Sequence, residues 1–448
     1  MPSTNSFQRR LAFKAGLILF IAILLLIPLS MISGKISERE SFQSQAEESI
    51  ARSWTAAQQL STPILVMPYD VKTGDKNTTT TVRQYRFIPL DFAEVRAEVL
   101  TTMRTKGVYA APVYNTHIAI KGFIEQEHIA VQLNTLGQTD GFIRHATPYI
   151  AVHTSDARGF SNTPTLQWRD LDIPVTPGSG LPALSSGFSA EITLASLETV
   201  ARNNRLPLTI AFELRGMSSL QVIPASLDTR IRVQSNWPHP EFIGAFLPVD
   251  HTVSADGFSA EWRVNTFSSN IEQTLQHCAS RHCKAFTALA FGTNFYQAVD
   301  IYLQSDRAIK YGILFIAVSF TALFMFEVIK RVPIHPVQYV FMGLSLAIFY
   351  LLLISLSEHL SFFISYLLSS FSCLTLLMVY LAKVMKSYRL SIRFSISLGV
   401  LYAVLLVIIQ LEDFALLMGT LMLFSMLTVL MVSTRHIDWY ALKQPNAQ

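Results

Sequence analysis

Six apolar runs interrupt the ordinary mixture of hydrophobic and polar residues along this chain. A helix needs roughly 20 mainly apolar residues to cross a bilayer core of about 30 Å. One run lies near the N-terminus and five lie in the last third of the chain, so the sequence predicts one N-terminal transmembrane helix and a C-terminal five-helix transmembrane bundle. The runs are Ala15–Ser33, Tyr311–Ile329, Pro336–Leu356, Leu360–Leu381, Phe394–Ile409 and Phe414–Ser433.

The long stretch between the first two runs shows the pattern of β-strands. Apolar and polar residues alternate along Tyr114–Phe123, Thr209–Leu214, Thr229–Gln234 and Phe258–Val264, and a period of two is typical of strands with one buried face. A short helix is predicted at Leu90–Thr105. We therefore expect a mainly-β domain that is β-sandwich-like, although the pattern does not determine the strand order.

The basic residues predict how the helices thread the membrane. With the N-terminus in the cytoplasm, every Lys and Arg outside residues 34–309 except Lys310 falls on the cytoplasmic side, as the positive-inside rule requires. We expect a bacterial inner membrane protein with both termini in the cytoplasm. Its parts are a tail with the first helix (1–33), a periplasmic domain (34–309), the bundle (310–434) and a second tail (435–448).

The first apolar run also has the basic start of a secretory signal peptide. No small-x-small cleavage site follows Leu29, so an uncleaved anchor is favoured, and either interpretation leaves the large domain in the periplasm. The formal net charge is +4, and its basic excess lies in the membrane part. It therefore reflects topology, and the lipid bilayer rather than nucleic acid is the expected partner.

The three cysteines favour one local disulfide. Cys373 lies in the fourth apolar run and is expected to be a small buried residue. Cys278 and Cys283 lie in the domain assigned to the oxidising periplasm, where a disulfide between them is favoured. The alternative is a zinc site made by His277, Cys278, His282 and Cys283, but structural zinc sites usually take ligands from two separated segments.

Ionisable residues near the ends of the membrane runs are the weak catalytic candidates. Glu358, His359, Glu412 and Asp413 lie in two turns on the periplasmic side. They are interpreted as ion pairs and helix caps, and the alternative is a proton or metal site that uses Glu358, His359 and Glu412. No acid or base lies near the middle of a run, which argues against a proton-coupled transporter.

The chain lacks the sequence motifs of serine hydrolases, zinc proteases and P-loop proteins, and no cofactor is expected. One periplasmic segment, Trp237–Phe246, combines aromatic residues with a histidine between two prolines. His239 is stiffly placed, either in a packed turn or facing a ligand. The candidate partner-binding residues are Trp237, His239, Phe242 and Phe246.

Several long motifs resemble the CreD family of inner membrane proteins, also called cell envelope integrity proteins. The resemblance extends over nearly the whole chain. The motifs are Ile36–Arg39, Pro63–Leu65, Trp237–Pro248, Gly257–Trp262, Arg307–Phe315, His335–Tyr339, Phe349–His359, Gln410–Gly419 and Thr434–Tyr440.

This resemblance implies a protein linked to envelope stress, the β-lactam response and colicin tolerance, whose expression depends on a sensor kinase and a response regulator. It supplies no catalytic residue. The favoured hypothesis is a non-enzymatic envelope-integrity protein whose periplasmic domain binds an unknown periplasmic or inner-membrane protein. The alternatives are a membrane enzyme that acts on an envelope precursor through the periplasmic-side carboxylates, or a transporter. The sequence does not indicate an oligomeric state.

Overall fold

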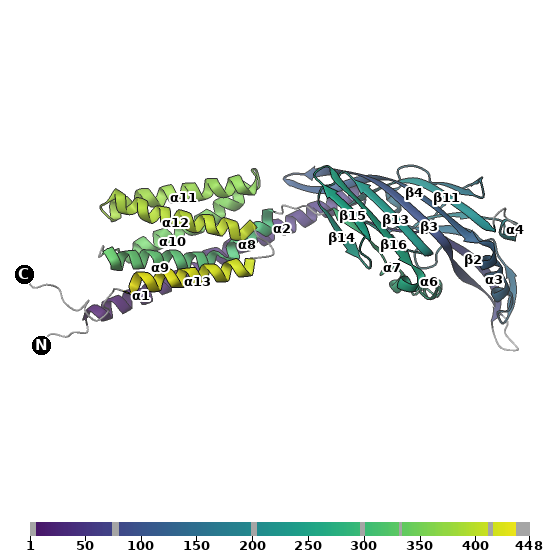
Figure 1. Cartoon of the computed structure of the whole chain (residues 1–448), viewed down its shortest axis with the longest axis horizontal. Helices are drawn as coiled ribbons and strands as arrows, with labels where there is room; N and C mark the ends of the chain where they lie inside the picture. Colours follow the sequence, from purple (N-terminus) through teal and green to yellow (C-terminus); the bar gives the residue numbers. More distant parts are fainter. Residues whose placement is uncertain are drawn as a thin grey trace, which may run out of the picture. The chain divides into compact units, whose positions relative to one another are not determined.

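Two units of different secondary structure make up the chain. One joins Met1–Gln43 with Val299–Gln448 and is helical, and the other, Ser44–Ala298, is mainly β. They are called the helical unit and the β domain below. The computed structural model describes residues 6–73, 80–198, 204–295, 301–330, 334–410 and 415–435, and its elements are labelled in Figure 1.

Apart from α8, the helices of the helical unit contain the predicted apolar runs. The N-terminal helix α2 continues past the boundary of this unit into the β domain's part of the chain. The helices are α1 (Ser6–Leu24), α2 (Leu26–Ser53), α8 (Ile301–Lys310), α9 (Gly312–Lys330), α10 (Pro336–Ser357), α11 (Phe362–Val384), α12 (Tyr388–Gln410) and α13 (Ala415–Thr434).

Five of the described helical segments are long and apolar enough to cross a membrane by length and composition. One is the N-terminal segment Phe13–Ser53, and the other four belong to α9, α10, α11 and α12. An N-terminal apolar helix and a C-terminal apolar bundle are therefore confirmed. The bundle differs from the prediction in one respect, because the apolar part of α13 described here, Leu417–Val432, is shorter than the others.

The N-terminal helix is interrupted by a proline and packs closely on the bundle. Pro28 lacks an N–H, and its ring would clash with the carbonyl of Leu24 in a continuous helix. Accordingly α1 ends at Leu24 and α2 begins at Leu26. The side chain of Leu25 lies against Gly343 of α10 and leaves no room for a Cβ there. A small residue at such a position lets two membrane helices approach closely.

The β domain contains long strands and a few short helices. The strands are β1 (Gln58–Ser61), β2 (Ile64–Thr73), β3 (Thr80–Lys106), β4 (Tyr109–Glu125), β5 (Phe142–His145), β6 (Tyr149–His153), β7 (Thr165–Trp168), β8 (Leu171–Ile173), β9 (Thr176–Pro177), β10 (Gly187–Glu191), β11 (Arg205–Met217), β12 (Ser219–Ile223), β13 (Ser226–Ser235), β14 (Pro240–Gly244), β15 (Asp250–Ser254), β16 (Gly257–Asn265) and β17 (Phe291–Phe295). The helices are α3 (Gln126–Gly137), η1 (Ala157–Gly159), α4 (Leu194–Glu198), α5 (Thr266–Ser269), α6 (Ile271–Ala279) and α7 (Lys284–Thr287).

The four alternating segments are strands, as predicted. They lie in β4, β11, β13 and β16. Along β11, every second residue from Leu206 to Leu214 is buried, and the residues between them are more exposed. This alternation follows from the pleat of a strand, which points successive side chains to opposite faces.

One strand, β3, organises the sheet. Its first part, Thr80–Pro89, pairs with β2, and its later part, Leu90–Val99, pairs in parallel with β13 on the same side. Its other side pairs with β4 over Phe92–Lys106. The sheet therefore has two arms that share β3. The first arm contains β2, β5, β6, β9 and β10, and the second contains β4, β7, β8, β11, β13, β15 and β16.

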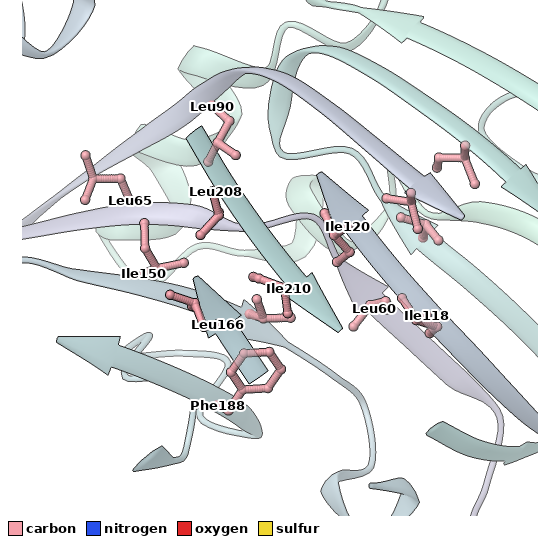
Figure 2. Close-up of a cluster of buried hydrophobic side chains, with 14 of the residues drawn as sticks. Leu60, Leu65, Leu90, Ile118, Ile120, Ile150, Leu166, Phe188, Leu208 and Ile210 are labelled. Atoms are coloured by element: carbon pink, nitrogen blue, oxygen red, sulfur yellow. The ribbon is translucent and has the colours of Figure 1, made fainter. Parts of the chain in front are cut away.

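The largest hydrophobic cluster among the described residues of the β domain lies between these two arms. Figure 2 shows side chains from both arms pointing toward a common space, among them Leu65 and Ile150 from the first arm and Leu208 from the second. Phe188 of β10 and Phe212 of β11 meet edge to face, with ring centroids 5.6 Å apart. The curled sheet thus packs on itself, and a four-stranded sheet in the order β1–β12–β17–β14 adds a second layer.

Two sequence predictions need correction. The domain is not a sandwich of two comparable sheets, because β3 joins both arms into one 13-stranded sheet that curls on itself, and the second sheet has only four strands. Leu90–Thr105 is part of β3 and not a helix. Its residues Ala93, Val95, Ala97 and Val99 are all buried at a spacing of two, because β4 and β13 bind its backbone on both sides.

The edge-to-face contact of Phe212 predicts a large effect on stability. Phe212 is fully buried, so Phe212→Ala should lower the free energy of unfolding by about 3–5 kcal/mol. Phe267→Ala is the matched control, because Phe267 is 97% exposed. Chemical denaturation of the full-length protein, followed by tryptophan fluorescence, measures both variants. Equal stability of the two variants would contradict the description of this core.

Candidate functional site

The strand β15 forms an open margin of the second arm. It pairs only with β16 among the described strands, and all five of its residues are exposed. An edge strand presents backbone N–H and carbonyl groups that can pair with another chain. By contrast β14, a strand of equal length at the margin of the four-stranded sheet, begins with Pro240, which has no N–H to donate.

Exposed apolar residues accompany this margin. Leu247 is 70% exposed, Val249 is 61% exposed and Val253 is 50% exposed. Val249 and Val253 are four residues apart and therefore point to the same side of the strand. We call Leu247, Val249 and Val253 the β15 patch. Exposed apolar residues beside an unpaired strand edge can contribute to an interaction surface.

The opposite side of β15 forms one wall of a polar groove. The groove has a volume of about 690 Å³, and Thr252 and Ser254 of β15 are among its lining residues. Its floor is a row of directly opposed residues that crosses six strands from β15 to β11. In order across the sheet the row is Thr252, Ser259, Gln234, Glu98, His117 and Glu213.

The groove has an acidic character. Glu98 and Glu213 flank His117 on the neighbouring strands, and Asp256 also lines the groove. His117 is the one basic residue among its described lining residues. Glu261 in the adjacent row differs, because it accepts hydrogen bonds from Arg232 of the same row and from Arg263 further along its own strand. Both arginines hold the pKa of that carboxyl below its usual value. The groove therefore favours a ligand or partner that carries positive charge.

The four aromatic and histidine candidates from Trp237–Phe246 lie beside this surface. Phe242 packs edge to face against His251 of β15, Phe258 and Trp262, with centroids 5.2–6.0 Å apart. Trp237, Phe242 and Phe246 are half-buried and pack against the main core. His239 is exposed. The aromatic residues therefore hold the segment in place.

The β15 patch and the row of residues through His117 were not among the candidate binding residues predicted from the sequence. Leu247 and Val249 flank Pro248 directly after the predicted segment, and this apolar pair beside a proline was an available signal. The row through His117 had no such signal. Its members come from strands far apart in the sequence, and only the register brings them together.

The weak catalytic candidates in the helical unit are placed as follows. Glu358 caps the end of α10, and its carboxylate lies 3.2 Å from Nε of Arg39. The backbone N–H of His359 donates to the carbonyl of Leu356 at the same helix end. Glu412 and Asp413 lie outside the described residues. The ion pair with Arg39 explains the position of Glu358, and the helix end explains that of His359. Neither position requires a catalytic role.

A second charged contact joins three helices of the same unit. Lys14 of α1 forms an ion pair with Glu327 of α9, and it also donates to the carbonyl of Ile334 at 2.6 Å. Glu327 accepts a further hydrogen bond of 2.8 Å from the hydroxyl of Tyr339 of α10. Buried charges persist when such partners satisfy them, so this contact is a structural connection between α1, α9 and α10.

Cys278 and Cys283 are joined by a disulfide. Their sulfur atoms are therefore engaged in a covalent bond, while His277 and His282 are exposed. Among the described residues, no group of three or more His, Cys, Asp or Glu side chains is arranged to hold a metal ion. The two cysteines belong to a hydrophobic cluster with Leu275, so the bond joins the end of α6 to the start of α7.

Comparison with known proteins decides the family. The family model described as "Inner membrane protein CreD" matches residues 10–440. This chain belongs to the CreD family. Inner membrane protein CreD of Escherichia coli (strain K12) is 33% identical to it over 430 residues, which cover 94% of this chain and 92% of that relative. Together with its apolar helices, CreD membership makes the chain a multi-pass inner membrane protein.

Solved structures add little to the CreD assignment. An M1 zinc metallopeptidase from Deinococcus radiodurans aligns with 39% of this chain and 38% of its own chain. The sequence identity is 7% and the TM-score is 0.19. A TM-score this low supports no conclusion about the fold or the activity of this chain.

The disulfide predicts a simple labelling result. Full-length protein that is denatured without a reductant should take up one iodoacetamide group, at Cys373. After reduction it should take up three, because Cys278 and Cys283 then react as well. Intact-mass spectrometry counts the adducts, and Cys373→Ala serves as the control that should take up none before reduction. Three adducts without reductant would contradict the disulfide.

Proposed function

We propose that this CreD-family protein is a non-enzymatic envelope-integrity factor whose β domain binds a protein partner at β15. The open β15 margin between an apolar patch and an acidic groove is the observation that carries this proposal. The helical unit anchors the domain in the inner membrane. The link to envelope stress and colicin tolerance is carried over from the resemblance to the CreD family.

The chemistry of the surface indicates the kind of partner. An extended segment of another protein can add to an exposed strand, and its main chain then supplies much of the binding energy. Alternate side chains of that segment would contact the β15 patch on one side and the groove on the other. Because Glu98, Glu213 and Asp256 line the groove, the segment should carry Lys or Arg on that side.

The proposal also includes the topology. All five C-terminal helices, α13 included, cross the membrane, both termini are cytoplasmic and residues 34–309 are periplasmic. The distribution of Lys and Arg supports this threading, and a disulfide between Cys278 and Cys283 suits an oxidising compartment. The partner is then a periplasmic protein or the exposed part of another inner membrane protein.

The enzyme alternative receives less support. Its carboxylate candidate Glu358 has Arg39 as a partner, and the ion pair explains its position at the end of α10. A binding role also agrees with the β domain, where the polar groove is broad and its side chains come from six strands.

Photocrosslinking in whole cells tests the proposal. A photoreactive amino acid that replaces Val253 should capture one discrete protein, because Val253 lies at the open margin. Val131 of α3 is the matched control, since it is 54% exposed but lies on another element. Capture of the same species at both positions, or of none at Val253, would contradict the proposal.

A charge variant then tests the role of the groove. The double substitution E98Q/E213Q in the Val253 crosslinking background should reduce capture several-fold, because the two carboxylates no longer attract a basic segment. The control is E127Q/E272Q, which removes two exposed carboxylates outside the groove. Equal capture by both double variants would show that the acidic groove plays no part.

A further inference from the structure

A second polar pocket lies in the first arm of the β domain. Its volume is about 580 Å³. It shares no lining residue with the acidic groove at β15, so it is independent of the proposed function. Its walls come from the β2–β3 hairpin, from the segment that joins β5 to β6, and from β9 and β10.

Two arginines from different strands are held at this pocket by one carboxylate. Arg83 of β3 donates to both oxygens of Asp70, at 2.9 and 3.3 Å. Arg144 of β5 donates through Nε to the second oxygen at 3.0 Å. The Asp70 side chain is only 7% exposed, whereas Arg83 is 50% exposed and Arg144 is 73% exposed.

The cluster of Asp70, Arg83 and Arg144 carries one positive charge in excess, and Glu191 on another wall is the one acidic residue among the described lining residues of the pocket. Hydrogen bonds from Arg83, and then from Arg144, hold the pKa of Asp70 below its usual value, so the carboxyl is ionised at neutral pH. A single negative charge therefore faces two guanidinium groups. Each guanidinium has five N–H donors, and Asp70 engages two donors of Arg83 and one of Arg144. Both arginines line the pocket.

A structural role for the pair explains only part of this geometry. Exposed ion pairs contribute little to stability, and one arginine would already neutralise Asp70. The second arginine comes from β5, the strand on the other side of β2. Two guanidiniums fixed at one carboxylate form the kind of preorganised donor set that binds phosphate or carboxylate groups.

The remaining walls suit a ring that carries hydroxyl groups. Tyr85 and Tyr149 are half-buried lining residues. The hydroxyl of Tyr149 donates to the carbonyl of Gly180 at 2.7 Å, which fixes its ring at the pocket. Glu191 and Ser189 also line the pocket and supply acceptors for ligand hydroxyls. The ligand that matches these walls has one anionic group and several hydroxyl groups on a compact ring. Acidic sugars have this chemistry.

We propose that this pocket binds a sugar that bears a phosphate or carboxylate group, with Arg83 and Arg144 on the anionic group. Glu191 accepts hydrogen bonds from the sugar hydroxyls, and the tyrosine rings contact the sugar ring. Asp70 acts as the positioning residue that holds both guanidinium groups.

Titration calorimetry on the full-length protein in nanodiscs of zwitterionic lipid tests this. The probes are glucose 1-phosphate, glucuronate, glucose and inorganic phosphate. Glucose 1-phosphate or glucuronate should bind at least tenfold more tightly than glucose and than inorganic phosphate. Whichever of the two binds identifies the anionic group. Binding of both acidic sugars no better than glucose, or no better than phosphate alone, would overturn the proposal.

Variants assign the binding to the two arginines. R83Q and R144Q should each weaken binding of the acidic sugar at least tenfold, and R144K should recover part of it. R158Q is the matched control, because Arg158 also pairs with an aspartate, Asp156, but does not line the pocket. Thermal unfolding followed by tryptophan fluorescence checks that each variant is folded. Unchanged affinity in folded R83Q and R144Q, or an equal loss in R158Q, would overturn the proposal.

Discussion

The β domain depends on the backbone pairing of β3. This strand spans Thr80–Lys106 and carries β2 and then β13 along one side, while β4 occupies the other side of its later part. Both arms of the sheet are therefore tied to one continuous piece of chain. Because the arms curl toward each other, Phe188 and Phe212 can meet in the core, and the outer faces remain available for polar grooves and pockets.

Polar chemistry is distributed differently in the two units. In the helical unit, the charged residues discussed above serve as contacts between helices or at helix ends, as Lys14–Glu327 and Arg39–Glu358 illustrate. In the β domain, polar side chains line open surfaces. One is the acidic row through His117, and the other is the pocket of Arg83 and Arg144. This contrast is what we expect of the membrane anchor and the binding domain that we propose.

The sequence predicted those features that depend on local patterns. Apolar runs indicated the membrane helices, and alternation indicated β4, β11, β13 and β16, because burial in a bilayer or on one sheet face leaves a direct trace in composition. The prediction of a helix at Leu90–Thr105 was wrong because Leu90, Ala93 and Ala97 also fall at helical spacing. The segment is a strand because its backbone pairs with β4 and β13. The acidic row and the Asp70 cluster depend on strand register, which no local pattern reveals.

Hydrogen–deuterium exchange at β15 tests the central claim most directly. The amides of Asp250–Ser254 would be compared between native membranes and the purified full-length protein, with β8 as the reference edge strand. Addition of a partner strand to β15 predicts slower exchange of these amides in native membranes, while β8 exchanges equally in both samples. Equal exchange of β15 in the two samples would contradict the claim that this margin is the partner-binding surface.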